Sequence, residues 1–543
     1  MSNYKRILKI IKWIVLIVPV FAVVLRVMHF RNATPPSGKE QHFGYNSALK
    51  IDKETSDGIK YSVNNSFASF SLDIAPPDKH CKKLFPDYDA ALRYCRNSGL
   101  PVIPSVQLIQ GKCKQFDDGL SAALELAVQQ GFGKNNIGKH EALSKLLDSL
   151  VKLLTELPEN RQSLAEPAII HVGTALSLGG SDLQLEPELT ARIQTEKDQF
   201  LSQPVKSEPV GFWTWNSHLQ ALFRQDRYLS QGFTVARDSP VCVLLSAIIS
   251  GDEELSHAFG RLREFNAKLT NPAYCISFDE VSDFIPGGIT INKLLDPDML
   301  EKIKAGLQQR FGKTAEFALV SYSESKEYSI LINEEINMGK NNSVQLIIDA
   351  VRSGRILLKP KPESGWYDYQ WYALETLLLY NRARESEKLK LSDAYKKRLE
   401  NAFKTSLAKH RETHIKNLPV FTLAGNLGGD GSKKHPEVII CPDFSAEPTA
   451  TVYLRYARAY RFLGNAMQAV LGKDFLMQLH RNNENSGSAE ANIETELRCM
   501  ALLCYGLYER LCPEIGQTPE YLPGEMSRDD IGSAAQVMLN PIQ

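Results

Sequence analysis

Apolar residues recur at three- and four-residue steps along most of this 543-residue chain, a spacing typical of amphipathic α-helices. The segment 141–156 is the clearest case, because its leucines fall on one helical face. We therefore predict a mainly α fold with a large helical body, arranged as a bundle or a toroid. The predicted helices are 88–97, 120–130, 141–156, 187–201, 218–230, 241–250, 253–269, 297–311, 367–384, 392–409, 449–470 and 489–511.

The helical pattern is interrupted between residues 316 and 360. Short runs rich in branched and aromatic residues at 317–322, 328–332 and 355–358 predict strands there, and 61–74 predicts one or two more. We therefore divide the chain into five parts. They are an N-terminal anchor (1–31), a flexible tether (32–60), a first helical part (61–315), a strand-containing insertion (316–360) and a second helical part (361–543).

The first 31 residues hold six basic side chains and no acidic one, and an apolar run from Trp13 to Leu25 separates the basic clusters. Extended to residues 7–30, the segment would measure about 36 Å as a helix, enough to cross a bilayer if the flanking lysines and arginines reach the headgroups. A cleaved secretory signal and an uncleaved signal anchor both fit. The absence of a small-residue cleavage site after the apolar run favours the anchor.

The charge around this segment predicts its orientation. Four basic residues precede the apolar run and two follow it, so we expect a cytoplasmic N-terminus and a periplasmic or extracellular body, with the membrane as a partner. The chain has 63 basic and 63 acidic residues, which leaves 57 basic against 63 acidic after residue 31. This mildly acidic body has no basic excess to neutralise phosphates, which argues against a nucleic-acid partner.

The nine cysteines show no CxxC pair and no Cys/His spacing typical of zinc sites. Phosphate-binding loops, dinucleotide-binding loops and nucleophile elbows are also missing from the sequence, so we predict no metal and no other cofactor. One or two disulfides are possible in an oxidising compartment, but the spacing does not define their connectivity. His410 and His414 are four residues apart, yet Arg411 replaces the glutamate of a zinc protease, which favours an exposed polar helix face.

Two groups of residues are candidate ligand contacts. Trp213 and Trp215 precede a predicted helix, where they would either form an aromatic platform for sugar or peptide or pack at the helix entry. Packing is the favoured interpretation, with Thr214, Asn216 or Ser217 as the N-cap. Arg224, with Asp226 and Arg227 on the same helix, would form a ligand clamp or a buried ion pair, or else a solvated face with local pairing, which is more common.

Carboxylates are the candidate catalytic residues. Asp279, Glu280 and Asp283 are close in sequence, and Glu447 follows a glycine-rich loop, 417–442, and precedes Pro448. Two facing carboxylates would supply a general acid and base. Surface acidity and helix initiation are the favoured interpretations of the two groups.

Residues 200–233, FLSQPVKSEPVGFWTWNSHLQALFRQDRYLSQGF, resemble the signature box of a bacterial exported helical family of unknown function. That box contains a GHYT motif followed by a helix of the form LxxYFRAMxW, and Gly211-Phe212-Trp213-Thr214 stands in place of GHYT. Glu447-Pro448 and the following Tyr453-Leu454-Arg455 are similar to the family's VEPxPxxYxRLA motif. The resemblance covers residues 90–510 in order and implies an exported helical fold without an established reaction. Phe212 stands where the family has a histidine.

The sequence thus leaves open whether the protein is an enzyme. The first expectation is a membrane-anchored binding or scaffolding protein of the cell envelope, whose partner is an envelope protein or a glycan. The alternative is an envelope or polysaccharide hydrolase that pairs Glu447 with Asp279 or Glu280 across a helical cleft, a possibility drawn by analogy with other helical folds.

Overall fold

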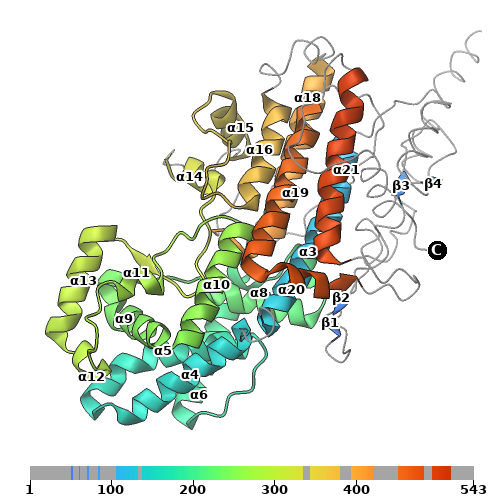
Figure 1. The fold of residues 1–543 in the computed structure, drawn as a ribbon. Helices are drawn as coiled ribbons and strands as arrows, with labels where there is room; N and C mark the ends of the chain where they lie inside the picture. Colours follow the sequence, from blue (N-terminus) through green and yellow to red (C-terminus); the bar gives the residue numbers. More distant parts are fainter. Residues whose placement is uncertain are drawn as a thin grey trace, which may run out of the picture. The chain divides into compact units, whose positions relative to one another are not determined.

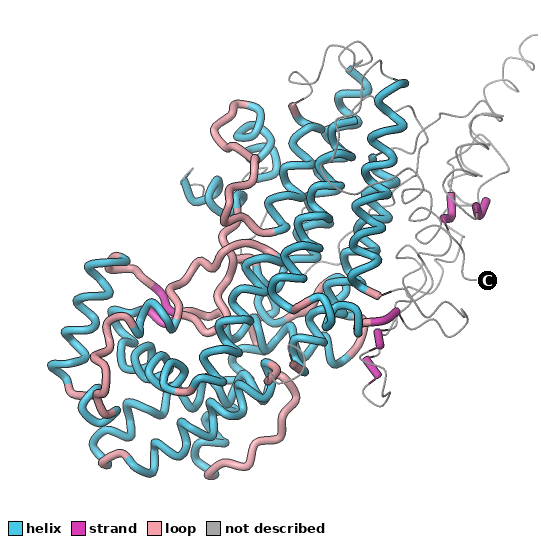
Figure 2. Tube along the Cα trace, viewed as in Figure 1, coloured by secondary structure: helices cyan, strands magenta, loops and turns pink. Residues whose placement is uncertain are grey.

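The computed structural model describes residues 51–52, 60–61, 70–72, 83–85, 106–131, 137–333, 343–379, 393–419, 450–481 and 492–514. The predicted anchor 1–31, the predicted helix 88–97, most of the glycine-rich loop 417–442 and Glu447 lie outside these residues. The described part is mainly helical, as the sequence predicts (Figures 1 and 2). Within it, every helix is too short or too polar to cross a bilayer.

The first group of helices covers residues 106–311. Its members are α3 (Val106–Gln130), α4 (Lys139–Glu156), α5 (Glu159–Leu178), α6 (Pro187–Leu201), α7 (Pro204–Ser207), the 3-10 helix η1 (Gly211–Thr214), α8 (Ser217–Leu229), α9 (Val235–Gly251), α10 (Glu253–Leu269), α11 (Phe278–Ser282), α12 (Ile291–Leu294) and α13 (Pro297–Phe311).

The second group follows residue 325. It consists of α14 (Lys326–Asn333), α15 (Ser343–Arg352), α16 (Trp366–Leu378), α18 (Asp393–His414), the 3-10 helix η3 (Ile415–Asn417), α19 (Ala450–Leu471), α20 (Lys473–Gln478) and α21 (Ile493–Glu514). Helix α19 packs against α16 and α21, and α16 also packs against α18 (Figure 1). Helices α10 and α3 are among those that connect the groups: α10 contacts α4, α9, α16 and α19, and α3 contacts α4 and α18.

The described strands are two or three residues long. β1 (Ile51–Asp52) pairs antiparallel with β2 (Lys60–Tyr61), which pairs parallel with β7 (His480–Arg481). β3 (Phe70–Leu72) pairs with β4 (Lys83–Phe85), and β5 (Phe233–Thr234) with β6 (Glu316–Phe317), both antiparallel. β1 and Lys60 lie within the stretch predicted as a tether.

The prediction of strands in the insertion 316–360 was largely wrong. Among the residues of the insertion that the structure describes, only the two residues of β6 form a strand. Residues 328–332 belong to α14, and 355–358 form a bend followed by irregular chain. A short apolar run does not by its periodicity distinguish a buried strand from a buried helix. Helices α14 and α15 make up 18 of the 36 residues of the insertion that the structure describes.

Capping residues explain why the best-predicted helices begin where they do. Pro187 and Pro297 occupy the first positions of α6 and α13, where a missing N–H costs no hydrogen bond. The carboxylate of Asp252 accepts hydrogen bonds from two backbone N–H groups at the start of α10, both at 3.0 Å. Asn216 caps α8, because its Oδ1 accepts a 2.8 Å bond from the N–H of Leu219.

Candidate functional site

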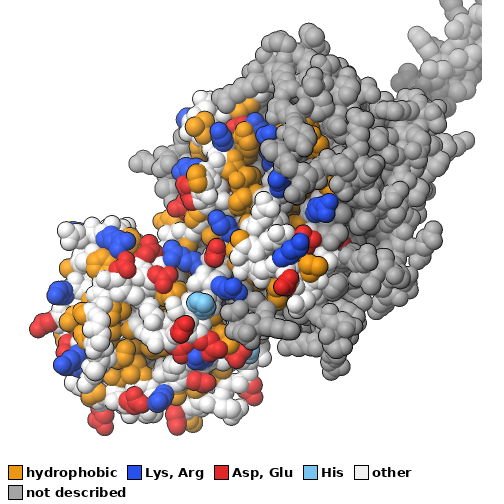
Figure 3. All heavy atoms as spheres, in the orientation of Figure 1, with side chains coloured by type: hydrophobic (Ala, Val, Ile, Leu, Met, Phe, Trp, Pro, Cys, Tyr) orange, Lys and Arg blue, Asp and Glu red, His pale blue; other side chains and the backbone are white. Residues whose placement is uncertain are grey.

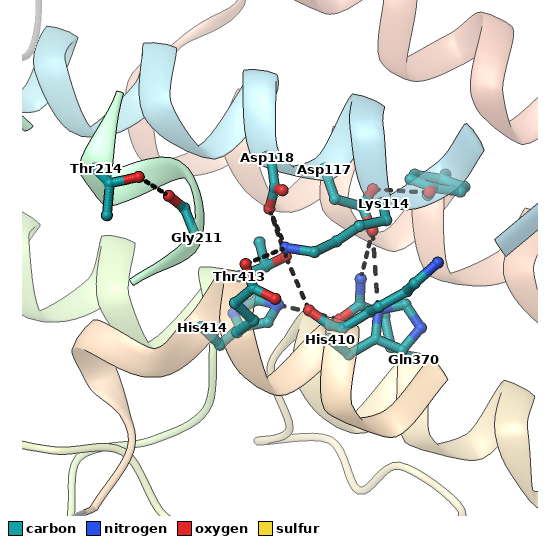
Figure 4. Close-up of polar contacts among 12 residues, drawn as sticks. Lys114, Asp117, Asp118, Gly211, Thr214, Gln370, His410, Thr413 and His414 are labelled. Atoms are coloured by element: carbon teal, nitrogen blue, oxygen red, sulfur yellow. Dashed lines mark hydrogen bonds and ion pairs between the residues drawn. The ribbon is translucent and has the colours of Figure 1, made fainter. Parts of the chain in front are cut away.

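The polar residues at the C-terminal end of α18 are buried, so the prediction of an exposed face for His410 and His414 was wrong. His410 is 1% exposed and His414 is 3% exposed. They meet polar side chains from three other helices, and we call this set the α3–α18 seam (Figure 4). It comprises Lys114, Asp117 and Asp118 of α3, Gln370 of α16, His410, Thr413 and His414 of α18, and Tyr460 of α19.

One end of the seam is a triad of Lys114, Asp118 and Thr413. The Lys114 Nζ lies 2.6 Å from the Asp118 Oδ1 and 3.0 Å from the Thr413 Oγ1, and the threonine hydroxyl donates to the same Asp118 oxygen at 2.8 Å. Burial alone would lower the pKa of Lys114, but the negative charges of Asp118 and Glu412 outweigh it and raise that pKa. The ammonium group therefore stays charged inside the protein.

The centre of the seam is Asp117, whose side chain is fully buried. Its Oδ1 accepts a 2.7 Å hydrogen bond from the Tyr460 hydroxyl, and its Oδ2 accepts a 3.0 Å bond from the Gln370 amide. Burial raises the pKa of Asp117 well above its usual value. This carboxyl group therefore joins α3, α16 and α19 through hydrogen bonds.

A chain of hydrogen bonds leads from Gln370 toward α10. The Gln370 Oε1 lies 3.0 Å from the His414 Nε2, and the His414 Nδ1 lies 3.1 Å from the Thr270 hydroxyl oxygen. The Asn417 amide then donates to Thr270 at 3.3 Å and to the Asn266 Oδ1 at 3.2 Å. The chain thus extends to the helix that packs against both helical groups.

Burial also keeps both histidines of the seam neutral near pH 7. It lowers the pKa of His410 to about 3 and the pKa of His414 well below its usual value. The His410 Nε2 lies 2.8 Å from the Tyr456 hydroxyl oxygen. Among the described residues, no group of three or more His, Cys, Asp and Glu side chains is arranged to hold a metal ion.

A second buried cluster lies around η3, and we call it the charge quartet: Glu125, Lys139, Asp226 and Lys416. The Lys416 Nζ lies 2.7 Å from a Glu125 carboxylate oxygen and 2.8 Å from the Asp226 Oδ2, and the Lys139 Nζ lies 2.5 Å from the Asp226 Oδ1. Two positive and two negative groups balance each other inside the protein. The interpretation of Asp226 as part of a solvated face was wrong.

Residues 211–216, which include the candidate ligand contacts Trp213 and Trp215, pack between these two clusters. Trp213 is 1% exposed, and its ring lies 5.7 Å from the Lys416 Nζ. Trp215 is half-buried and its ring meets Phe212 edge-on at 5.8 Å. Gly211 has a φ of 58°, and a Cβ there would clash with the Glu412 side chain.

The arginines of α8 contact backbone carbonyl groups. Arg224 is half-buried and its Nε lies 3.4 Å from the Ser207 carbonyl oxygen. Arg227 is buried, contrary to the favoured solvated face, and its Nη1 donates to the carbonyl oxygens of Ile415 and Leu418 at 3.2 and 2.7 Å. These bonds attach α8 to η3.

Of the candidate catalytic carboxylates that the structure describes, Asp279 and Asp283 are exposed and Glu280 is half-buried. Acidic and basic side chains are interspersed on the face of the molecule shown in Figure 3. Asp279 is exposed, and its Oδ2 lies 3.8 Å from an Arg263 nitrogen. Glu280 forms a capping box with Ser277 at the start of α11, and Asp283 pairs with Arg310 at 2.9 Å. The structure thus brings Asp279 and Glu280 to one arginine.

A small pocket adjoins this surface. It is lined by Phe259, Arg263, Asn266, Asn271, Cys275 and Ser321, among others. The two asparagines are already bonded inside the protein: Asn266 to Asn417 at 3.2 Å, and Asn271 to Asp368 at 3.0 Å. These amides therefore position the helices around the pocket.

Sequence reasoning missed the residues that contribute most to both clusters, among them Lys114, Asp117, Lys139 and Lys416. A usable indication exists in α3, where three charged residues fall within the five positions 114–118, just before the largely apolar run 119–128. No family model, curated protein or solved structure matches the chain. The resemblance to an exported helical family remains a prediction.

Proposed function

We propose that the protein is a membrane-anchored, exported helical protein that binds or scaffolds a partner at the cell envelope, either an envelope protein or a glycan. The basic and apolar pattern of residues 1–31 supports the anchor, its charge distribution supports export of the body, and the family resemblance agrees with both. The mildly acidic body argues against a nucleic-acid partner.

The main support for the scaffolding role is that the polar residues of the α3–α18 seam are engaged in contacts between helices. His410, His414 and Asp117 are of the types that enzymes use for proton transfer. Here they are buried and bonded to Tyr456, Gln370 and Tyr460, and so connect α3, α16, α18 and α19. Groups committed to such contacts stabilise one arrangement of helices, which suits a body that presents a constant surface.

The alternative, a hydrolase with paired carboxylates, needs Asp279 or Glu280 opposite Glu447. Arg263 lies next to Asp279 and Glu280 at the surface, and Glu280 is also used in the α11 cap. These contacts favour structural roles for both carboxylates.

Fractionation of cells that express the full chain tests this proposal. We expect the chain in the membrane fraction, an N-terminus at or near Met1, and a body digested by protease added from outside the cytoplasmic membrane. Crosslinking in intact cells should then capture an envelope protein or glycan. A soluble form that begins after Phe30 would disprove the anchor. Hydrolysis of an envelope polysaccharide by the purified protein, lost in Glu447→Gln, would favour the hydrolase.

A further inference from the structure

A loop with basic side chains around an exposed leucine follows α15, and we call residues 353–361 the basic loop. Leu357 is 71% exposed, more than any other large apolar side chain that the structure describes. Arg355, Lys359 and Lys361 are exposed as well. They are the three basic residues of the loop, which contains no acidic residue. The loop leaves α15 at the edge of the second helical group (Figures 1 and 2).

Contacts with the rest of the fold hold the backbone of the loop on both sides of Leu357. Gly354 has a φ of 74°, which turns the chain away from α15, and the Ile356 N–H donates a 3.4 Å hydrogen bond back to a carbonyl of that helix. On the other side, Leu358 is fully buried, and its carbonyl oxygen accepts a 3.0 Å bond from the Lys326 Nζ. The fold itself therefore directs the Leu357 side chain toward solvent.

The charge next to Leu357 is available to a partner. The Lys361 Nζ lies 3.7 Å from a Glu363 carboxylate oxygen, and the lysine side chain is 77% exposed. An ion pair this exposed contributes little free energy, so the ammonium group can exchange the carboxylate for another anion. Lys359, two positions earlier, is also exposed. The basic loop thus presents an apolar side chain bordered by positive charge.

We propose that the basic loop binds an anionic phospholipid surface, with Leu357 inserted at the level of the headgroups and the basic side chains beside the phosphates. Exposed lysines and arginines next to an apolar side chain are typical of segments that lie on such surfaces. A peptide partner would need a groove for its own side chains, whereas Leu357 protrudes from the loop. A plane of lipid headgroups accepts a protruding side chain without a matching groove.

This inference rests on the proposed function in one respect, because the anchor would bring the body close to a bilayer. The contact itself depends on the loop alone. Each basic side chain near an anionic surface strengthens binding about five-fold, and the apolar side chain adds to this. Binding by the loop and insertion of residues 1–31 can therefore be measured separately.

Photo-crosslinking of the full chain in lipid nanodiscs tests the contact. The photoreactive residue p-benzoylphenylalanine replaces Leu357, the discs contain either phosphatidylglycerol or phosphatidylcholine, and mass spectrometry identifies lipid adducts. We expect adducts with phosphatidylglycerol and a several-fold lower yield with the neutral phosphatidylcholine. High salt should lower the yield with phosphatidylglycerol, because exposed charges are screened. Lys359→Gln in the same protein should reduce it about five-fold.

Leu201 is the matched control position for the photoreactive residue. It is 38% exposed, and the surrounding stretch 196–208 has three acidic and two basic residues, so it should show no preference for phosphatidylglycerol. Equal yields with the two lipids at position 357, or no lipid adduct there in discs that contain the chain, would overturn the proposal.

Two further outcomes separate the loop from the anchor and from a protein partner. A chain that fails to enter the discs would contradict the anchor, and phosphatidylglycerol vesicles added to that chain would then test the loop by the same adduct. Crosslinking from position 357 in intact cells to a protein in place of lipid would overturn the lipid contact and identify the basic loop as a protein-binding surface.

Discussion

The ammonium group of Lys416 lies 2.8 Å from the Asp226 carboxylate, although the two residues are 190 positions apart and each side chain is 1% exposed. Removing two charges from water is costly, so such a pair persists only when further contacts satisfy both groups. Here Glu125 and Lys139 complete the charge quartet.

Lys416→Met should therefore destabilise the protein by about 3–5 kcal/mol, because it leaves Glu125 without its partner and Asp226 with Lys139 alone. Urea unfolding followed by circular dichroism measures the change. Lys361→Met is the matched control, since Lys361 pairs with Glu363 at the surface at 3.7 Å and its side chain is 77% exposed. Equal effects of the two substitutions would contradict the structural role of the quartet.

Gly211→Ala should also destabilise the protein. At a φ of 58° an alanine is strained by about 1–2 kcal/mol, and its Cβ would displace Glu412, which lies 3.8 Å from Lys114. Gly260→Ala should have the opposite sign, because Gly260 is inside α10 with open space around it, and alanine favours a helix by about 0.5–1 kcal/mol. Thermal unfolding of the two variants tests whether the conformation of residues 211–216 requires a glycine at position 211.

His410→Gln should make stability less dependent on pH in acid. In the folded protein the pKa of His410 is about 3, against a usual value of 6.5, so the unfolded chain binds more protons below pH 6.5. The free energy of unfolding therefore falls as pH is lowered from 6.5 toward 3, and removing this group should reduce the slope by about 1.4 kcal/mol per pH unit. Urea unfolding at a series of pH values measures the slope.

Other buried groups also contribute to the pH dependence, among them His414, whose lowered pKa acts with the same sign as that of His410 and is present in both proteins. The raised pKa of Asp117 has the opposite effect on the pH dependence of stability, because at acidic pH the folded protein binds a proton there more readily than the unfolded chain. Asp117 is present in both the wild type and the His410→Gln variant, so its contribution cancels in the comparison. His171, whose pKa burial lowers to about 4, acts with the same sign as His410. His171→Gln should therefore give a similar but smaller reduction, and parallel curves for wild type and both variants would contradict the burial of these rings.

Asn216→Ala should cost about 1 kcal/mol, because the first turn of α8 loses the acceptor for the N–H of Leu219. Thr290→Ala is the comparison, since Thr290 occupies the same position before α12 without a side-chain cap bond. A difference between the two in urea unfolding isolates the cap. An equally stable Asn216→Ala protein would show that tertiary packing alone fixes the start of α8.

Local sequence is sufficient to predict the helices whose ends are capped by their own residues. The predicted 187–201, 253–269 and 297–311 coincide with α6, α10 and α13. Helix α5 was missed, because it contains Pro167 and its C-terminal half is buried almost all round, so it has no amphipathic face to detect. Residues 328–332 were predicted as a strand but belong to α14. The neighbouring Glu327 on this helix bonds Tyr367 and Arg411, which lie far away in the sequence.

The candidate site was harder to predict than the fold. Two histidines four residues apart are common on an exposed helix face. Only their hydrogen-bond partners distinguish a buried pair from an exposed one. Those partners lie on α16 and α19: His414 bonds Gln370 and His410 bonds Tyr456. No local pattern in residues 393–414 indicates these contacts. The N-cap of α8 was predictable because its acceptor and donor are three residues apart.

The sequence separations within the α3–α18 seam set the order in which the chain can fold. Lys114 and Thr413 are 299 residues apart, and Asp117 and Tyr460 are 343 apart. During synthesis α3 is complete long before either partner exists, so its charged residues must remain hydrated until α18 and α19 have emerged from the ribosome. Stable packing of the two helical groups is therefore a late event, and a chain that ends before residue 450 leaves Asp117 without the tyrosine that α19 supplies.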